Sequence, residues 1–410
     1  MPQMSSDLAQ RLGCVAIPPG LRGFETEPAA SSADQAFSVT LDGASISGIV
    51  PVSGRPTGTL LSGFVDLHVH LDKNYTVERT GAAQGDLFKA ITRIIAERSQ
   101  WTASDLRQRM SRALTDAYAC GTRALRTHLD WSDAATVPPS VPVLQELRAS
   151  WADRLSLQWV SLTPLDLFAD AQAGAAIAAG VHAADGILGA FVYRNQDIDS
   201  KLQRVFELAV AHGLRLDFHV DEGLHVDADG LGRIARLTVA HGMQGRVTCG
   251  HACSLSVQDA AQAEATLALC AEARIHLVAL PTTNLYLQGA WHETPVQRGI
   301  TRLKEAQALG VSASIATDNV ADVFYPYGSY DLLDSFGLGV QAAHLASAQQ
   351  WLDSITTRPA LAMGLAWDGR LRSGCPADLV LVDASNEYEL LSPLGRQRTV
   401  VRAGQVLASI

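Results

Sequence analysis

Eight short apolar runs alternate with longer segments of helical periodicity across the middle of the chain. Each run has the length and the β-branched composition of a buried strand. Strand–helix alternation repeated in this way predicts parallel strands joined by right-handed crossovers, and hence a closed (β/α)₈ barrel of the α/β class. The strands are expected at Leu61–His68, Arg123–His128, Leu155–Leu162, Ile187–Val192, Arg215–Val220, Arg246–His251, Ile275–Leu280 and Val311–Ala316.

The two ends of the chain have a different pattern, with turn-forming residues between short β-like runs. These runs are Ala36–Leu41, Ala44–Val52, Ala377–Ala384 and Arg398–Ile410. We expect residues 1–61 and 368–410 to pair into one small discontinuous β-sandwich, and residues 62–367 to form the barrel.

Composition excludes several classes of protein. Of the 410 residues, 47% are hydrophobic, which is ample for a large core. Lys and Arg number 32 against 42 Asp and Glu, so the net charge of −10 argues against nucleic acid or an anionic membrane as partner. No apolar stretch approaches the ~20 residues of a membrane span, and we see neither a signal peptide nor a disulfide framework. We expect a cytoplasmic protein, and its modest charge is compatible with a homo-oligomer.

Histidines and carboxylates stand at the carboxyl ends of five of the predicted strands. In such a barrel the carboxyl ends of the strands build the active site. A lone histidine at a strand end is most often structural, but agreement among five strand ends favours a functional site. The five ends read His68-Val-His70-Leu-Asp72, His128-Leu-Asp130, His219-Val-Asp221-Glu222, Gly250-His251 and Thr317-Asp318-Asn319.

Four of these side chains suit one divalent metal ion. Side chains alternate along a strand, so His68 and His70 point to the same face and can share an ion. His219 and Asp318 would complete its ligands, and three imidazoles with one carboxylate suit Zn²⁺ or Fe(II). No lysine ends the fourth strand, so a binuclear site bridged by a carboxylated lysine is not expected.

Glu222 and His251 are the candidates for proton chemistry. Glu222 follows His219 by three residues, so it can face the same site only if the strand has already broken into a loop. From there it could take a proton from metal-bound water and deliver it to a leaving nitrogen, with a solvated loop glutamate as the alternative. His251 could polarise the bond under attack. Lys73 either reaches the pocket or lies on its rim.

Four motifs together resemble the amidohydrolase superfamily, and within it the cytosine deaminase branch. They are GFVDLHVHLD (Gly63–Asp72), HVDEG (His219–Gly223), GHA (Gly250–Ala252) and TDN…YPYG (Thr317–Gly328). The likeness extends over nearly the whole chain. It implies a mononuclear Zn²⁺ or Fe²⁺ site on His68, His70, His219 and Asp318, a proton shuttle at Glu222 and a strand-six histidine at His251. The implied reaction is attack of metal-bound hydroxide on an amidine-like ring carbon with loss of ammonia.

The positions that read the substrate depart from that branch. Its Phe-Pro-Gln segment is Ser161–Leu165 here, the second aspartate of its Asp-Asp pair is Asn319, and the following tryptophan is Phe324. A site built for one ring edge discriminates against others, so cytosine is expected to be a poor substrate. The amide of Asn319 predicts a substrate acceptor near strand eight, or a leaving group other than a simple exocyclic amine. The other pocket-wall candidates are Phe324, His128, Asp130, Tyr286 and Lys73.

We therefore predict a metal-dependent hydrolase that attacks a C–N bond of a small nitrogen heterocycle by hydrolytic deamination. One alternative is an alkylaminohydrolase or a cyclic-amide hydrolase acting on a triazine- or hydantoin-like ring. A second is a non-catalytic ligand-binding barrel. A phosphate-ester or carbohydrate enzyme is disfavoured, because no Gly-rich phosphate turn follows strands seven or eight.

Overall fold

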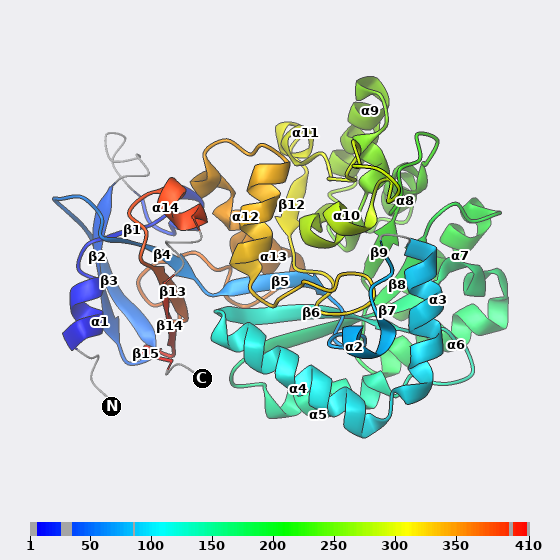
Figure 1. Ribbon diagram of the computed structural model, residues 1–410, viewed down its shortest axis with the longest axis horizontal. Helices are drawn as coiled ribbons and strands as arrows, with labels where there is room; N and C mark the ends of the chain where they lie inside the picture. Colours follow the sequence, from blue (N-terminus) through cyan, green and yellow to red (C-terminus); the bar gives the residue numbers. More distant parts are fainter. Residues whose placement is uncertain (1–5, 26–34, 85–86, 393–396, 408–410) are drawn as a thin grey trace.

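The computed structural model describes residues 6–25, 35–84, 87–392 and 397–407. A small sheet beside both chain ends lies next to a larger barrel (Figure 1). Residues 408–410 of the last predicted β run lie outside the described residues.

Eight parallel strands form the barrel in chain order, each overlapping a predicted strand, which confirms the predicted barrel. Val69 pairs in parallel with Asp318, and the Asp318 amide donates to the carbonyl of His68 at 2.9 Å, so the first and last strands meet. The strands are β5 (Phe64–Val69), β6 (Thr122–Asp130), β7 (Ser156–Pro164), β8 (Leu188–Val192), β9 (Leu216–Val220), β10 (Val247–His251), β11 (His276–Ala279) and β12 (Ser312–Ile315).

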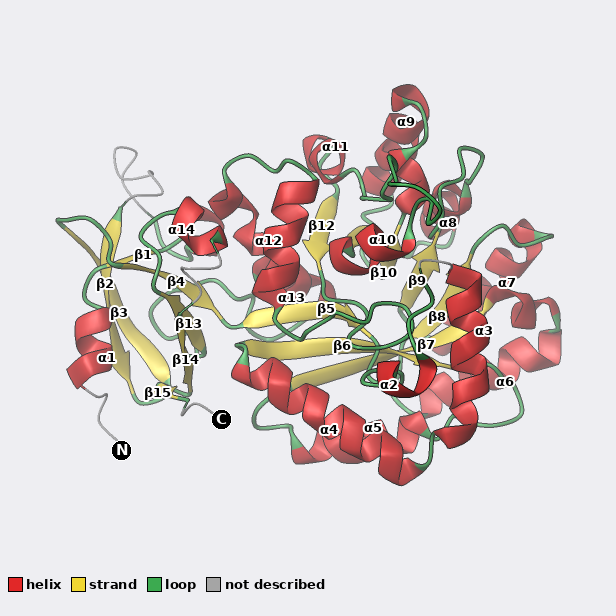
Figure 2. Cartoon of the chain, viewed as in Figure 1, coloured by secondary structure: helices red, strands yellow, loops and turns green. Residues whose placement is uncertain are grey.

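Helices surround these strands on the outside (Figure 2). Side-chain caps fix several of their starts: Thr102 accepts from the Asp105 amide, and Asp259 from the Gln262 amide. The longer helices are α3 (Leu87–Glu97), α4 (Ala103–Ala119), α5 (Ser140–Ser150), α6 (Ala171–Ala183), α7 (Ile198–His212), α8 (Gly230–Ala240), α9 (Ala260–Glu272) and α12 (Leu332–Ala342). Within the described ranges, none of the helices has the length and apolar character that crossing a membrane requires.

Shorter helical elements connect and cover these parts. They are α1 (Ser6–Arg11), α2 (Val77–Thr80), α10 (Pro281–Leu287), α11 (Leu303–Ala308), α13 (Thr357–Met363) and α14 (Glu387–Leu391), with 3₁₀ segments at Pro19–Leu21, Arg98–Gln100, Leu165–Ala169, Cys253–Ser256 and Ala348–Ile355.

The terminal segments share one seven-stranded sheet, which confirms that both ends of the chain build a separate β unit. Its order is β15-β14-β13-β4-β1-β2-β3, and β13 pairs antiparallel with β4. Only Gly63 separates β4 from the first barrel strand, so this pairing anchors the sheet to the start of β5. The strands are β1 (Val15–Ala16), β2 (Ala36–Asp42), β3 (Ser45–Val52), β4 (Gly58–Ser62), β13 (Leu379–Val382), β14 (Arg398–Arg402) and β15 (Gln405–Val406).

Candidate active site

Three imidazole nitrogens and one carboxylate oxygen meet at the carboxyl end of the barrel. The Nε2 atom of His219, on β9, lies 3.1 Å from Nε2 of His68 and 3.3 Å from Nε2 of His70. The Oδ1 atom of Asp318, just after β12, lies 3.2 Å from His70 Nε2 and 3.6 Å from His68 Nε2. All four side chains are buried. His68 on β5 and His70 directly after it therefore face the same way, as the sequence predicted.

These separations fit a tetrahedral metal ion. Zinc binds imidazole nitrogen and carboxylate oxygen at about 2.0–2.2 Å, so two ligand atoms at tetrahedral corners lie roughly 3.3–3.6 Å apart. The Asp318 carboxylate oxygen Oδ1 is buried and has no hydrogen-bond partner in the described parts of the chain. Burial lowers the pKa of His68, His70 and His219 well below the ordinary value, so the three imidazoles are neutral and can donate lone pairs. The residues present fit one divalent ion.

His128 packs against this cluster and is not among the residues that line the cavity. Its ring centroid is 3.9 Å from that of His68, and its Nε2 atom is 3.3 Å from Oδ1 of Asp217. Its backbone carbonyl lies 3.3 Å from Nδ1 of His70. A proton on that Nδ1 leaves Nε2 of His70 free as a ligand atom. The structure thus places His128 as a support for the cluster, apart from the wall where the sequence had suggested it.

Glu222 lies on the loop after β9, as its spacing from His219 required. The break occurs at Asp221, whose backbone φ is 51° and whose carboxylate accepts from the Gly230 and Leu231 amides at the start of α8. The Glu222 side chain is buried, lines the cavity, and has Oε1 3.5 Å from Nδ1 of His251. Burial and the nearby Asp318 carboxylate raise the pKa of Glu222 well above its ordinary value.

His251 ends β10 with a left-handed backbone, at a φ of 69°. Asn284 donates from Nδ2 to Nδ1 of His251 at 3.1 Å, a donor assignment that places the ring proton on Nε2. Nε2 is buried and has no partner among the described residues. Burial lowers the pKa of His251 to about 4, so the ring is a neutral N–H donor at physiological pH.

A cavity with about 630 Å³ of empty space opens over these groups. One wall carries paired charges: Asp130 accepts from Lys73 Nζ at 2.7 Å and from Arg98 Nη2 at 2.7 Å. Burial alone would raise the pKa of Asp130, but these two cations lower it well below its ordinary value. The lining residues are His70, Lys73, Leu87, Ile91, Ile94, Arg98, Asp130, Leu162, Pro164, Phe191, His219, Glu222, His251, Asn319 and Phe324.

Asn319 is held in one orientation by a buried carboxylate. Its Nδ2 donates to Oδ2 of Asp322 at 2.7 Å, and Oδ1 of Asp322 accepts from the amides of Phe324 and Tyr325. This contact uses an N–H of Asn319 and leaves its Oδ1 to accept a hydrogen bond. The second N–H of the amide also stays available, so Asn319 can still meet the substrate acceptor that the sequence suggests, or a substrate donor at Oδ1.

Tyr286, a predicted wall residue, lies outside the cavity. It packs edge-on against Trp291, Tyr325 and Tyr327 and lines a neighbouring depression. Phe324 does line the cavity, with Lys73 Nζ 5.5 Å from its ring centroid.

Sequence reasoning missed the contribution of α3, which supplies Leu87, Ile91 and Ile94 to the cavity. Their spacing of four and three residues is the apolar stripe of an amphipathic helix. That stripe was visible in the sequence, but it does not tell whether the helix covers the side of the barrel or its open end.

Comparison with known proteins places this geometry in a family. A family model described as "Amidohydrolase family" matches residues 81–408. The chain belongs to the amidohydrolase family. It is 39% identical over 400 residues, covering 94% of this chain and 90% of the relative, to a pterin deaminase from Rhizobium rhizogenes (strain K84 / ATCC BAA-868). The predicted superfamily is thereby confirmed, and this amidohydrolase is a hydrolase of carbon–nitrogen bonds other than peptide bonds.

Solved structures show the same fold. The amidohydrolase superposes on 5-methylcytosine deaminase from Klebsiella pneumoniae with a TM-score of 0.82 at 24% identity, covering 97% of each chain. It superposes on N-isopropylammelide isopropylaminohydrolase from Burkholderia multivorans ATCC 17616 with a TM-score of 0.75 at 25% identity, covering 96% of this chain and 97% of that one. The agreement over both parts of the chain confirms the fold class.

Proposed function

We propose that this amidohydrolase hydrolytically deaminates a pterin, with one divalent ion held by His68, His70, His219 and Asp318. The observation that carries the proposal is the buried carboxylate of Glu222, set beside His251 in a cavity over four correctly spaced ligand atoms. The full-length similarity to a pterin deaminase supports the choice of ring. In the reaction, water replaces the exocyclic amino group of the ring, which leaves as ammonia.

The ion would be Zn²⁺ or Fe²⁺, and when bound it would supply a Lewis acid that makes water a nucleophile near neutral pH. Glu222 takes the proton from the attacking water and returns it to the leaving nitrogen. Its raised pKa suits the second half of this task, because the protonated carboxyl is a stable donor until the amine forms.

His251 and Asp318 complete the proton chemistry around the ring. The neutral Nε2–H of His251 donates to the part of the ring that gains negative charge during attack. Asp318 lies close enough to raise the pKa of Glu222, and because its Oδ1 would hold the ion, the transferred proton is carried by Glu222 alone.

The cavity wall supports a planar, polar ring. Phe191, Phe324 and the apolar residues of α3 can cover the ring faces. Asp130, anchored by Lys73 and Arg98, and the free Oδ1 of Asn319 accept hydrogen bonds from ring N–H groups. No glutamine stands in the Ser161–Leu165 segment, which supports a ring other than cytosine.

The test is ammonia release from pterin by the metal-loaded enzyme, with cytosine and N-isopropylammelide as competing candidates. Glu222→Gln is expected to lower kcat by about 10²–10⁴-fold while metal content is unchanged. Glu264→Gln, an exposed change on α9, is the control and retains full activity. Full turnover by the Glu222 variant would refute its role, and amine release from N-isopropylammelide alone would replace the proposed reaction.

A further inference from the structure

The active-site cavity does not end at Glu222. A second hollow, with about 1,310 Å³ of empty space, shares Leu87 and Glu222 with it. We call this hollow the annex. The start of α3 borders it on one side and the 287–297 segment on another, with the loops after β8 and β9 between them. The two spaces therefore adjoin at these two residues, next to the group proposed to transfer the proton.

Aromatic side chains extend from the cavity into the annex. The ring of Phe191, in the cavity wall, stacks on Tyr193 in the annex, with centroids 5.8 Å apart and planes at 15°. Tyr193 packs edge-on against Phe88 of α3 at 5.1 Å. At the rim, Phe88 is 51% exposed and Trp291 is 47% exposed. Large aromatic side chains left open beside a binding cavity offer stacking surface to a ligand.

Gly223, directly after Glu222, leaves the space that the aromatic side chains of the annex need. The Tyr193 hydroxyl lies 2.6 Å from Nε2 of His225, and this pair closes over the backbone of Gly223. A Cβ atom at Gly223 would lie 2.7 Å from the Tyr193 hydroxyl, so only glycine leaves room for the tyrosine there. The annex wall is thus joined directly to the residue that carries the proposed proton.

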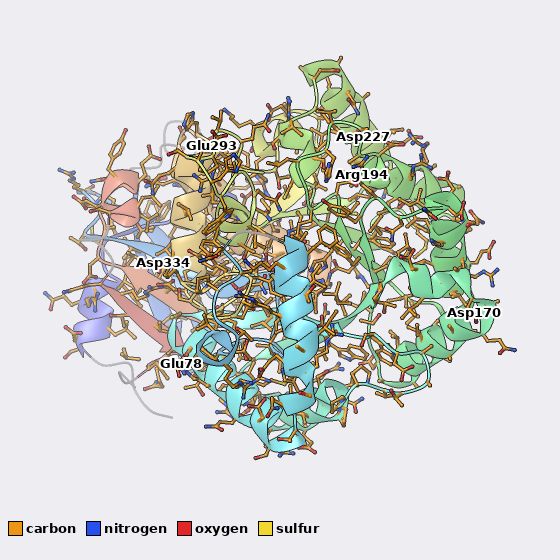
Figure 3. All side chains as sticks on the ribbon, turned by 45° about the vertical axis from the view of Figure 1, so that its right-hand side comes forward. Glu78, Asp170, Arg194, Asp227, Glu293 and Asp334 are labelled. Atoms are coloured by element: carbon orange, nitrogen blue, oxygen red, sulfur yellow. The ribbon has the colours of Figure 1, made fainter. Side chains whose placement is uncertain are left out.

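Charge in the annex is neutral to negative. Among the described residues that line it, Glu222 and Glu293 carry carboxylates, Gln84, Gln288 and Gln297 carry amides, and none is Lys or Arg. Arg194, which Figure 3 labels along with Glu293, forms an ion pair with Asp227, with Nη2 2.8 Å from Oδ2. Lys73 and Arg98 are held by Asp130 in the cavity wall. An anionic group in the annex would therefore meet the Glu293 carboxylate, with no Lys or Arg among the described lining residues to compensate it.

We propose that the annex is a substrate subsite for an uncharged substituent, aromatic or hydroxylated, carried by the heterocycle whose reacting carbon lies at Glu222. This inference rests on the proposed function, because that function places the ring in the cavity. The substituent stacks on Phe88 and Tyr193, and the amide side chains bind its polar atoms. The annex thereby selects ring substituents by charge and by shape.

The experiment compares pterin with its 6-phenyl and 7-phenyl derivatives and with the two matching para-carboxyphenyl compounds. With the metal-loaded full-length enzyme, one phenyl isomer is expected to exceed pterin in kcat/KM by about two- to tenfold. Its carboxylate analogue is expected to fall below the phenyl compound. If pterin is turned over and neither phenyl isomer gains in kcat/KM or in binding, or if the carboxylates are preferred, the annex is overturned.

Binding to the Glu222→Gln enzyme separates this inference from the proposed function. If no compound releases ammonia but a phenyl isomer binds the variant more tightly than pterin, deamination is refuted and the annex stands. If pterin is deaminated and the phenyl group has no effect on either measurement, the annex is refuted and deamination stands. Absence of both turnover and binding refutes both.

Variants locate the effect in the annex. Phe88→Ala and Trp291→Ala are expected to reduce the ratio of kcat/KM between the favoured phenyl compound and pterin. Ile95→Ala is the matched control, because Ile95 is 52% exposed on the same helix and does not line the annex. An unchanged ratio in both aromatic variants contradicts the proposal.

Discussion

The Nε2 atoms of His68 and His219 lie 3.1 Å apart although their residues belong to β5 and β9, on opposite sides of the barrel. Burial lowers the pKa of both imidazoles, so neither is charged at neutral pH. Nε2 of His70 and Oδ1 of Asp318 complete the group. One divalent ion would satisfy all four atoms at once, and without it four lone-pair donors would face one another in a buried place.

Removal of one ligand should therefore abolish metal binding. His219→Ala is expected to fall to less than about one tenth of an equivalent of bound metal after gel filtration, and to lose activity with it. Elemental analysis of the purified chain measures the metal. His212→Ala, at the end of α7 away from the site, should keep both. A fully loaded His219 variant would show that the metal lies elsewhere.

Removal of the Asp130 carboxylate should destabilise the protein more than removal of Arg98, one of its two cationic partners. Asp130→Asn leaves the ammonium of Lys73, 3% exposed, without its hydrogen-bonded carboxylate, and should lower the free energy of unfolding by about 3–5 kcal/mol. Arg98→Met leaves Asp130 paired with Lys73 and should cost about 1 kcal/mol, because Arg98 lies nearer to solvent. Urea unfolding measures both. Equal losses would mean that the arginine is the main partner.

The barrel was predictable from sequence because its strands are buried on both faces. A strand such as Leu188–Val192 is a continuous apolar run, and helical periodicity on either side fixes its limits to within a few residues. The spacing of His68 and His70 was equally informative, since the alternation of a strand determines that both face one way.

The walls of the cavity were less predictable because they depend on how loops and helices fold over the barrel end. Tyr286 follows a barrel strand closely, yet α10 turns it toward Trp291. His128 ends a predicted strand like the candidate ligand histidines, but its ring packs against His68 and faces Asp217, and it is not among the residues that line the cavity. The sequence shows that Asn319 replaces the second aspartate of the family's Asp-Asp pair. Its side-chain orientation depends on a hydrogen bond to the Asp322 carboxylate, which no sequence motif indicates.

Asn319→Asp should destabilise the protein progressively as the pH rises. Burial raises the pKa of Asp322 to about 7, and a second carboxylate 2.7 Å away would raise the pKa of the pair further. A carboxyl whose pKa is raised in the folded state loses stability as the pH climbs through that pKa. The variant should therefore lose about 1–3 kcal/mol relative to wild type between pH 6 and pH 9.

Chemical denaturation across that range measures this loss. Asn195→Asp is the matched control, because Asn195 also donates to a carboxylate, Asp166, but in an exposed pair. Solvent screening should keep its loss small and nearly independent of pH. If the free energy of unfolding fell with pH equally in the two variants, the carboxyl pair at positions 319 and 322 would not be a buried one.

His276 should make the protein sensitive to acid. It lies on β11 with Nε2 2.7 Å from the Ser314 hydroxyl, and burial, Arg126 and Arg358 lower its pKa to about 3. As the pH falls below about 6.5, the unfolded chain gains a proton at this residue and the folded chain does not. The stability advantage of wild type over His276→Gln should therefore shrink by up to about 1.4 kcal/mol per pH unit from pH 6 to pH 4. Urea unfolding of both chains at each pH measures the difference, in which other titrating groups cancel. His292→Gln, an exposed change, is the control, and a difference for His276→Gln that does not vary with pH would mean that the folded state also protonates this ring.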